Sequence, residues 1–131
     1  MRVALAAVLS SVAVIAPGDR AAATFGSGSL RLTLHYLMTC GQPGPGPLAV
    51  TLPGAFRIAN LRVAVNGKPA SVSHHGRTMD VTLTKPPQLT CMSIGEGTLR
   101  VTISGLHAPR GTYTATARVN RHSFRPSFRV G

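Results

Sequence analysis

The chain has 131 residues and carries 14 lysines and arginines against only three acids, which gives a formal net charge of +11. This shortage of carboxylates excludes the usual calcium-binding loops, which need several clustered oxygen ligands. It also argues against hydrolysis by a pair of catalytic acids, and the length suits one domain around one core.

Residues 1–23 have the organisation of a secretory signal peptide. Arg2 supplies a positive start, Val3–Ala16 is a predominantly apolar run of fourteen residues, and three alanines ending at Ala23 suit a signal peptidase. As a helix the run would span about 21 Å, short of the roughly 30 Å hydrocarbon core, which disfavours an uncleaved membrane anchor. We expect cleavage after Ala23 and a secreted product, residues 24–131, that is extracellular or held at the cell envelope.

Beyond this leader, apolar and polar residues alternate with a period of two, which predicts β-strands, and helix signals are scarce. The clearest strand is Leu30–Thr39, and a short segment around Phe56–Ile58 also has strand character. In chain order the predicted strands are Leu30–Thr39, Leu48–Leu52, Leu61–Val65, Lys68–Ser73, Thr78–Thr84, a strand through Leu99–Ile103, Thr112–Val119 and Ser123–Val130.

Turn signals separate these strands. The strongest is Asn66-Gly67, because both positions tolerate a positive φ and so favour a two-residue hairpin. A second turn is predicted at His74–Arg77, and Asn120–His122 joins the last two strands. Seven or eight short strands, with turns about every ten residues, are typical of an all-β fold in which two antiparallel sheets pack as a sandwich.

Two segments resemble bacterial Ig-like or fibronectin-type-III-like domains. Val63–Thr84, with its Asn66-Gly67 turn and a second glycine turn, is similar to the middle of such domains, and Gly111–Ala115 with Ser123–Arg125 resembles their last two strands. The resemblance implies an antiparallel Ig-like β-sandwich and carries over no functional residue. The chain departs from the true immunoglobulin pattern, since it has no Trp and no Cys two residues after Tyr113.

Cys40 and Cys91 are the only cysteines, and in an exported chain they predict one disulfide. The bridge would close a loop of about fifty residues, worth roughly 4 kcal/mol in the chain-entropy model. Both cysteines adjoin irregular or Pro/Gly-rich stretches, so we expect a link between loops at one end of the sandwich. A catalytic cysteine is disfavoured because neither lies in a recognisable nucleophile motif.

Arginines concentrate toward the C-terminus, where Arg118, Arg121, Arg125 and Arg129 are predicted to form a cationic face able to fork onto phosphate or carboxylate groups. We therefore interpret the chain as a non-catalytic binding or structural module that attaches to an anionic envelope polymer or membrane surface; a protein partner is also open. Two simpler explanations remain open, an arginine-rich composition and charged side chains that protect a sheet edge from aggregation. Only six aromatic residues argue against sequence-specific nucleic-acid recognition.

The alternative function is a carrier of a small ligand or a metal such as copper, built in the loops near the two cysteines. Histidine, methionine and cysteine are suitable ligand types. The candidates besides the cysteines are His74, His75, Met79, Met92 and His107. No resident cofactor is predicted, because the closely spaced Cys, His and Met of copper proteins are missing near the chain end. No enzymatic activity is predicted either, since no Gly-x-Ser-x-Gly elbow occurs.

The predicted disulfide has a direct test. Titration of the purified secreted protein with a thiol reagent under denaturing, non-reducing conditions should find no free thiol, and reduction beforehand should release two. Two reactive thiols without reduction would show that Cys40 and Cys91 are not bridged.

Overall fold

The computed structural model describes residues 19–39, 48–83, 94–119 and 122–131. These residues form strands and turns, and every strand pairing among them is antiparallel. Within this part of the chain, no helix has the length and apolar character needed to cross a membrane.

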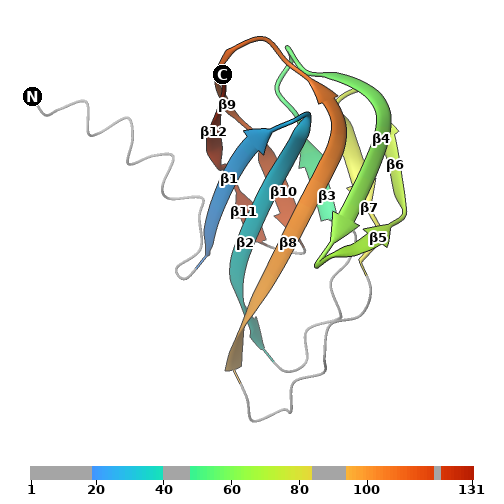
Figure 1. The fold of residues 1–131 in the computed structure, drawn as a ribbon. Coiled ribbons are helices and arrows are strands. Elements are labelled where there is room, and N and C mark those ends of the chain that lie inside the picture. The colour runs from blue at the N-terminus through green and yellow to red at the C-terminus, as the bar shows by residue number, and fades with distance from the viewer. Residues whose placement is uncertain (1–18, 40–47, 84–93, 120–121) are drawn as a thin grey trace, which may run out of the picture.

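Two five-stranded sheets form the body of the molecule, with sheet A in front of sheet B in Figure 1. Sheet A contains, in spatial order, β1 (Arg20–Gly26), β2 (Ser29–Thr39), β8 (Ile94–His107), β4 (Arg57–Val65) and β5 (Lys68–Ala70). Sheet B contains β11 (His122–Phe124), β10 (Thr116–Val119), β3 (Leu48–Thr51), β7 (Thr78–Val81) and β6 (Val72–His75). A third, two-stranded sheet pairs β12 (Ser127–Val130) with β9 (Gly111–Thr114).

The predicted antiparallel β-sandwich is confirmed, but the prediction of seven to eight strands is wrong, because twelve strands occur in the described residues alone. Several predicted strands are each divided in two. Ser71 separates β5 from β6, which then join different sheets, and Ala115 separates β9 from β10. Pro126 separates β11 from β12, since proline has no N–H to donate to a ladder. One further strand, β1, begins within the segment that the sequence assigns to the leader.

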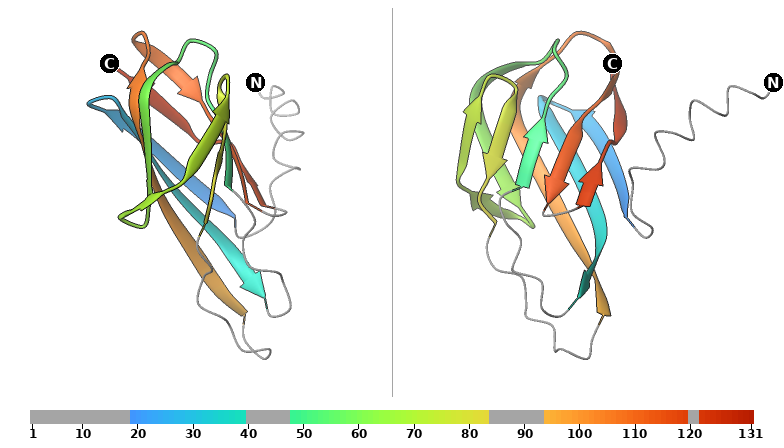
Figure 2. Two further views of the ribbon diagram at one scale, coloured as in Figure 1. Left: turned by 90° about the vertical axis from the view of Figure 1, so that its right-hand side faces the viewer. Right: turned by 180° about the vertical axis from the view of Figure 1, so that it is seen from behind.

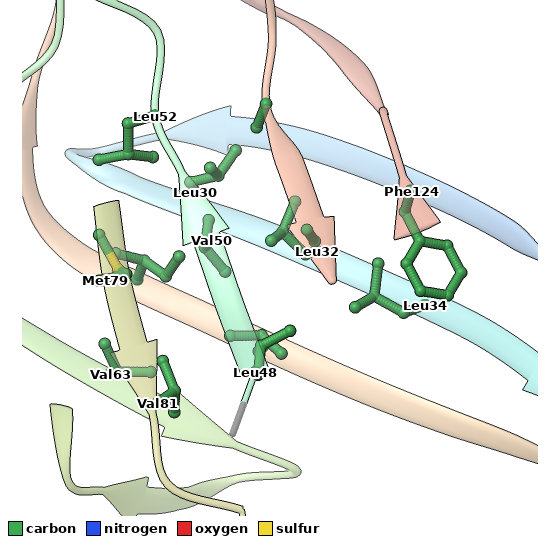
Figure 3. Close-up of a cluster of buried hydrophobic side chains, with 14 of the residues drawn as sticks. Leu30, Leu32, Leu34, Leu48, Val50, Leu52, Val63, Met79, Val81 and Phe124 are labelled. Atoms are coloured by element: carbon green, nitrogen blue, oxygen red, sulfur yellow. The ribbon is translucent and has the colours of Figure 1, made fainter. Parts of the chain in front are cut away.

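The core fills the space between the two sheets, as Figure 3 shows. Leu30, Leu32 and Leu34 project inward from β2 and are at most 1% exposed. They pack in one cluster with the inward residues of sheet B, among them Leu48, Val50, Met79, Val81 and Phe124. The alternation of apolar residues in the sequence thus identifies the buried face of each central strand.

The last four strands form one continuous hairpin in spite of their division. Ala117 pairs with Phe124 in sheet B and Tyr113 pairs with Phe128 in the small sheet, which is the same register on both sides of the break. At the break itself the amide of Ala115 donates a hydrogen bond of 3.1 Å to the carbonyl of Pro126. Side chains therefore alternate without interruption along both arms of this C-terminal hairpin.

An aromatic cluster joins this hairpin to sheet A. The ring of Phe128 on β12 stacks on Phe25 of β1, with centroids 6.4 Å apart, and meets Phe56 edge-on at 5.8 Å. Phe56 also contacts Tyr113 at 5.2 Å, and the Tyr113 hydroxyl donates to the carbonyl of Pro109 at 2.8 Å. This bond from a late tyrosine to the backbone four residues upstream is of the kind found at the tyrosine corner of immunoglobulin-like sandwiches.

Cys40 and Cys91 lie outside the described residues, so the disulfide stays a prediction. The strand residues that flank them are described: Thr39, directly before Cys40, pairs with Ile94, three residues after Cys91. The described residues nearest to the two cysteines thus lie at one end of the β2–β8 ladder, where these two strands extend below the rest of the sandwich in Figure 1.

The pairing of β4 with β8 contains one irregularity, and a glycine makes it possible. The register shifts between Ile58 and Arg62, where Asn60 has a φ of 59°. Opposite the shift, Gly105 has a φ of 87°, and a Cβ on it would collide with the backbone carbonyl oxygens of Ala59 and Asn60. The segment around Phe56–Ile58, for which the sequence gives only a weak strand signal, enters β4 just before this bulge.

Replacement of Gly105 by alanine should therefore destabilise the fold by about 2 kcal/mol or more, since strain from the positive φ adds to the backbone collision. The measurement is urea unfolding followed by circular dichroism. Gly26→Ala is the matched control, because its φ is not positive and a Cβ there would meet no atom within 4 Å. Equal stability of the two variants would contradict the role assigned to Gly105.

Candidate anion-binding faces

The outward side of the C-terminal hairpin carries arginines separated by hydroxyl-bearing residues. On β9 and β10 the outward positions are Thr112, Thr114, Thr116 and Arg118, and on the returning arm they are Ser123, Arg125, Ser127 and Arg129. All three arginines are exposed, whereas the residues that alternate with them, Ala117, Phe124 and Phe128, are buried. We call this the hairpin face.

The strand register sets the spacing of its charges. Arg118 pairs with Ser123, so that Arg118 and Arg125 are diagonal neighbours with Cα atoms about 7–8 Å apart. Arg129 lies four residues beyond Arg125 on the same arm, a distance of about 13 Å. Between them the hydroxyls of Thr114 and Ser127 are hydrogen-bonded at 2.9 Å.

Carboxylates are scarce around this face. In sheet B, Arg118 pairs with Ala49, which in turn pairs with the exposed Asp80 on β7, two strand spacings or about 10 Å away. The one ion pair that the described residues form joins Asp19 to His122 and involves none of these arginines. Of the four arginines predicted from the sequence, Arg118, Arg125 and Arg129 lie together on one face, and Arg121 lies outside the described residues.

A second cationic face, which the sequence analysis did not identify, covers the outside of sheet A. Arg31 on β2 pairs with Thr102, and Arg100 on β8 pairs with Thr33, so that the two arginines are diagonal neighbours about 7–8 Å apart. The remaining arginines and hydroxyl-bearing residues on this side are Arg20, Thr24, Ser29, Arg57, Arg62, Thr98 and Ser104. We call it the sheet A face.

Hydrogen bonds between neighbouring strands fix the positions of several polar side chains on the sheet A face. Ser29 and Ser104 join their hydroxyls at 3.0 Å, and the Nδ1 atom of His35 lies 3.0 Å from the hydroxyl of Thr98. The signal for this face was present in the sequence, because inward leucines on β2 require Arg31 to point outward. That Arg31 and Arg100 are neighbours could not be read from the sequence, since it depends on the pairing of β2 with β8.

The only buried charged residue in the described part of the chain is Asp19, which precedes β1. Its carboxylate, 1% exposed, accepts hydrogen bonds from Nδ1 of His122 at 3.0 and 3.1 Å. The imidazole in turn packs against Tyr36, with ring centroids 4.9 Å apart. Burial raises the pKa of the Tyr36 hydroxyl. Ser123, which follows His122, points to the opposite side of β11, so this Asp–His pair joins the two sheets rather than activating that hydroxyl.

The residues proposed for a metal or small-ligand carrier do not gather in the described structure. Met79 is fully buried in the core, and His74 and His75 are exposed residues of β6 rather than of a loop. His107 is exposed at the end of β8, and Met92 and both cysteines lie outside the described residues. Among the described residues, no group of three or more histidines, cysteines or acids is placed to hold a metal ion.

Comparison with known proteins finds no family model and no curated protein that matches this chain. Among solved structures, the chain is similar to BslA, described as a bacterial hydrophobin, with 22% sequence identity and a TM-score of 0.49 over 86% of this chain and 96% of that one. It is also similar to ACE19, the collagen binding subdomain of the Enterococcus faecalis surface protein ACE, with 7% identity and a TM-score of 0.40 over 88% of this chain and 98% of the other. The assignment of a β-sandwich rests on the sheet topology described above.

Proposed function

We propose that this protein is a non-catalytic module of the cell envelope or extracellular space that binds linear polyanions through its hairpin face. The observation that carries the proposal is the placement of Arg118, Arg125 and Arg129 on one exposed face with no ion pair to a described carboxylate. Like charges at these spacings, about 7–13 Å, repel one another, and a bound anion relieves that repulsion.

The chemistry of the face suits phosphate or carboxylate groups. A guanidinium presents a planar fork of N–H donors that matches both anions, and it is less strongly hydrated than an ammonium group. The threonine and serine hydroxyls between the arginines supply additional donors close to the sheet. Because Arg118 and Arg125 are diagonal neighbours and Arg129 lies farther along the same arm, the charges are spaced for a repeating polymer rather than for one small ion.

A polymer suits this face better than a membrane does. Peripheral helices and anchors that hold proteins on a bilayer combine basic residues with apolar side chains that enter the headgroup region. The outward positions of the hairpin are arginine, threonine and serine. Of its three aromatic residues, Phe124 and Phe128 are buried. The third, Tyr113, lies on the inward side, where its ring packs against Phe56 and Phe128. The same lack of exposed rings leaves no stacking platform for nucleic-acid bases.

Protection of a sheet edge is the competing explanation, since β11 is the edge strand of sheet B and charged residues discourage pairing with a second molecule. Edge protection requires charge alone and predicts no affinity for polymers. Binding of a polyanion by guanidinium forks requires arginine in particular, so lysine substitutions separate the two explanations.

Inorganic polyphosphate is a suitable probe. The double variant Arg118→Gln/Arg125→Gln should bind immobilised polyphosphate on the order of tenfold more weakly than the wild type in 50 mM salt, and wild-type binding should weaken steeply as salt rises, because each phosphate contact releases counterions. Arg57→Gln/Lys68→Gln is the charge-matched control, with two exposed cations on the far strands of sheet A. Arg118→Lys/Arg125→Lys should lose part of the affinity while keeping the charge.

Equal weakening in the hairpin variant and in the control would show that net charge alone is responsible and would overturn the proposed site. Vesicles of anionic phospholipid provide the other arm of the experiment. Binding to vesicles without binding to polyphosphate would assign the face to a membrane surface instead.

A further inference from the structure

We infer that the sheet A face is a second polyanion-binding site, and that the protein therefore cross-links polyanion chains. This inference rests on the function proposed for the hairpin face and extends it to the opposite side of the molecule. It concerns chiefly Arg31 and Arg100, with Arg20 and Arg62 at the margins of the face.

The position of the central pair argues for a role in binding. Charged residues at a sheet edge are explained by protection against aggregation, and this explanation applies to Arg125, directly after β11, and to Arg129 on β12. Arg31 and Arg100 instead lie on β2 and β8, which have strands on both sides in the order β1-β2-β8-β4-β5. Guarding an edge therefore cannot account for two arginines that are diagonal neighbours in the middle of a sheet.

Neither Asp19 nor Asp80 compensates the charges of Arg31 and Arg100. Asp19 is buried against His122, and Asp80 lies on the outer side of sheet B. The residues around the two arginines are short and polar, and the bonds between Ser29 and Ser104 and between His35 and Thr98 hold several of them close to the sheet. Arg31 and Arg100 are both exposed above these shorter polar side chains.

The two cationic faces point in opposite directions. The sheets of a sandwich pack about 10 Å apart with the core between them, and the side view at the left of Figure 2 shows the two layers. The hairpin face and the sheet A face are the outer surfaces of these layers. Each can therefore hold a different polymer chain, and simultaneous binding links the two chains with the avidity expected of a bivalent protein.

Stoichiometry and light scattering test this inference with the full chain. In calorimetry with a short polyphosphate of about five phosphates, the wild type should bind two molecules, whereas Arg31→Gln/Arg100→Gln and Arg118→Gln/Arg125→Gln should each bind one. With long polyphosphate, the wild type and a Lys68→Gln/Arg77→Gln control, which removes two exposed cations outside both faces, should produce light scattering. Each face variant should lose the scattering while remaining bound to immobilised polymer. Thermal unfolding verifies that each variant is folded, and Arg31→Lys/Arg100→Lys serves as the backup if the glutamine variant is not.

The outcomes separate the two proposals. A wild type that binds one short polyphosphate, with Arg31→Gln/Arg100→Gln indistinguishable from it, would overturn the second site and leave the hairpin face intact. A wild type that does not bind polyphosphate at all would overturn both the proposed function and this extension.

An independent observation concerns the processing of the leader. We propose that the mature protein retains Asp19, so that cleavage occurs before this residue and not after Ala23. Asp19 is buried, and its bonds to His122 connect the start of β1 in sheet A with β11 in sheet B, 103 residues apart in the chain.

Cleavage after Ala23 would damage the fold in three ways. It would remove Arg20–Ala23, which make up more than half of the seven-residue strand β1, together with their pairing to β2. It would also remove Ala21 and Ala23, which pack against the core. Finally, His122 would lose the carboxylate that its ring nitrogen contacts.

Secretion of the full chain from a bacterial host, followed by intact mass measurement and N-terminal sequencing, tests this proposal. The secreted product should begin at or before Asp19, and a product that begins at Thr24 would overturn it. As a second readout, Asp19→Ala should lower the melting temperature of the secreted protein by roughly 5 °C or more, whereas Asp80→Ala, on an exposed residue, should change it little. Identical masses and melting temperatures for wild type and Asp19→Ala would show that Asp19 is removed.

Discussion

The inward leucines of β2 hold the two sheets together, because they pack against the inner side of sheet B. The other features of the structure follow from this contact. Leu30, Leu32 and Leu34 are essentially inaccessible to water, and burial of one such side chain contributes on the order of 2 kcal/mol. Because successive residues of a strand point to opposite sides, this burial also fixes which residues face outward. As a direct consequence of where the leucines lie, Arg31 is exposed and Thr33 is half-buried on the outer side of the sheet.

The same constraint explains why both outer faces of the sandwich are cationic. Threonine suits the exposed side of a strand, since its branched side chain packs well on a pleated surface. In this chain the outward positions that are not threonine or serine are often arginine, and acids are nearly missing. The sandwich thus presents positive charge on two opposite sides.

Two different kinds of interaction join β1 to the C-terminal hairpin at one side of the sandwich. At one end the rings of Phe25, Phe56 and Phe128 pack together. Farther along, the carboxylate of Asp19 accepts hydrogen bonds from His122. Removal of water from a carboxylate is costly unless hydrogen bonds replace it, so this contact requires a well-defined position for the start of β1. The folded unit therefore includes Asp19 and all of β1.

The amino-acid sequence alone predicts the all-β class, the inward and outward sides of the main strands, the Asn66-Gly67 hairpin and the cationic character of the surface. These properties follow from local rules, since side-chain alternation and turn conformation depend on a few neighbouring residues. Three other features could be seen only in the folded structure. Arg31 is a diagonal neighbour of Arg100, Asp19 accepts hydrogen bonds from His122, and β1 pairs with β2. Each of these features depends on which strands pair and in what register. Many different strand pairings are compatible with the same alternation of apolar and polar residues. The packing of the whole core selects one of them.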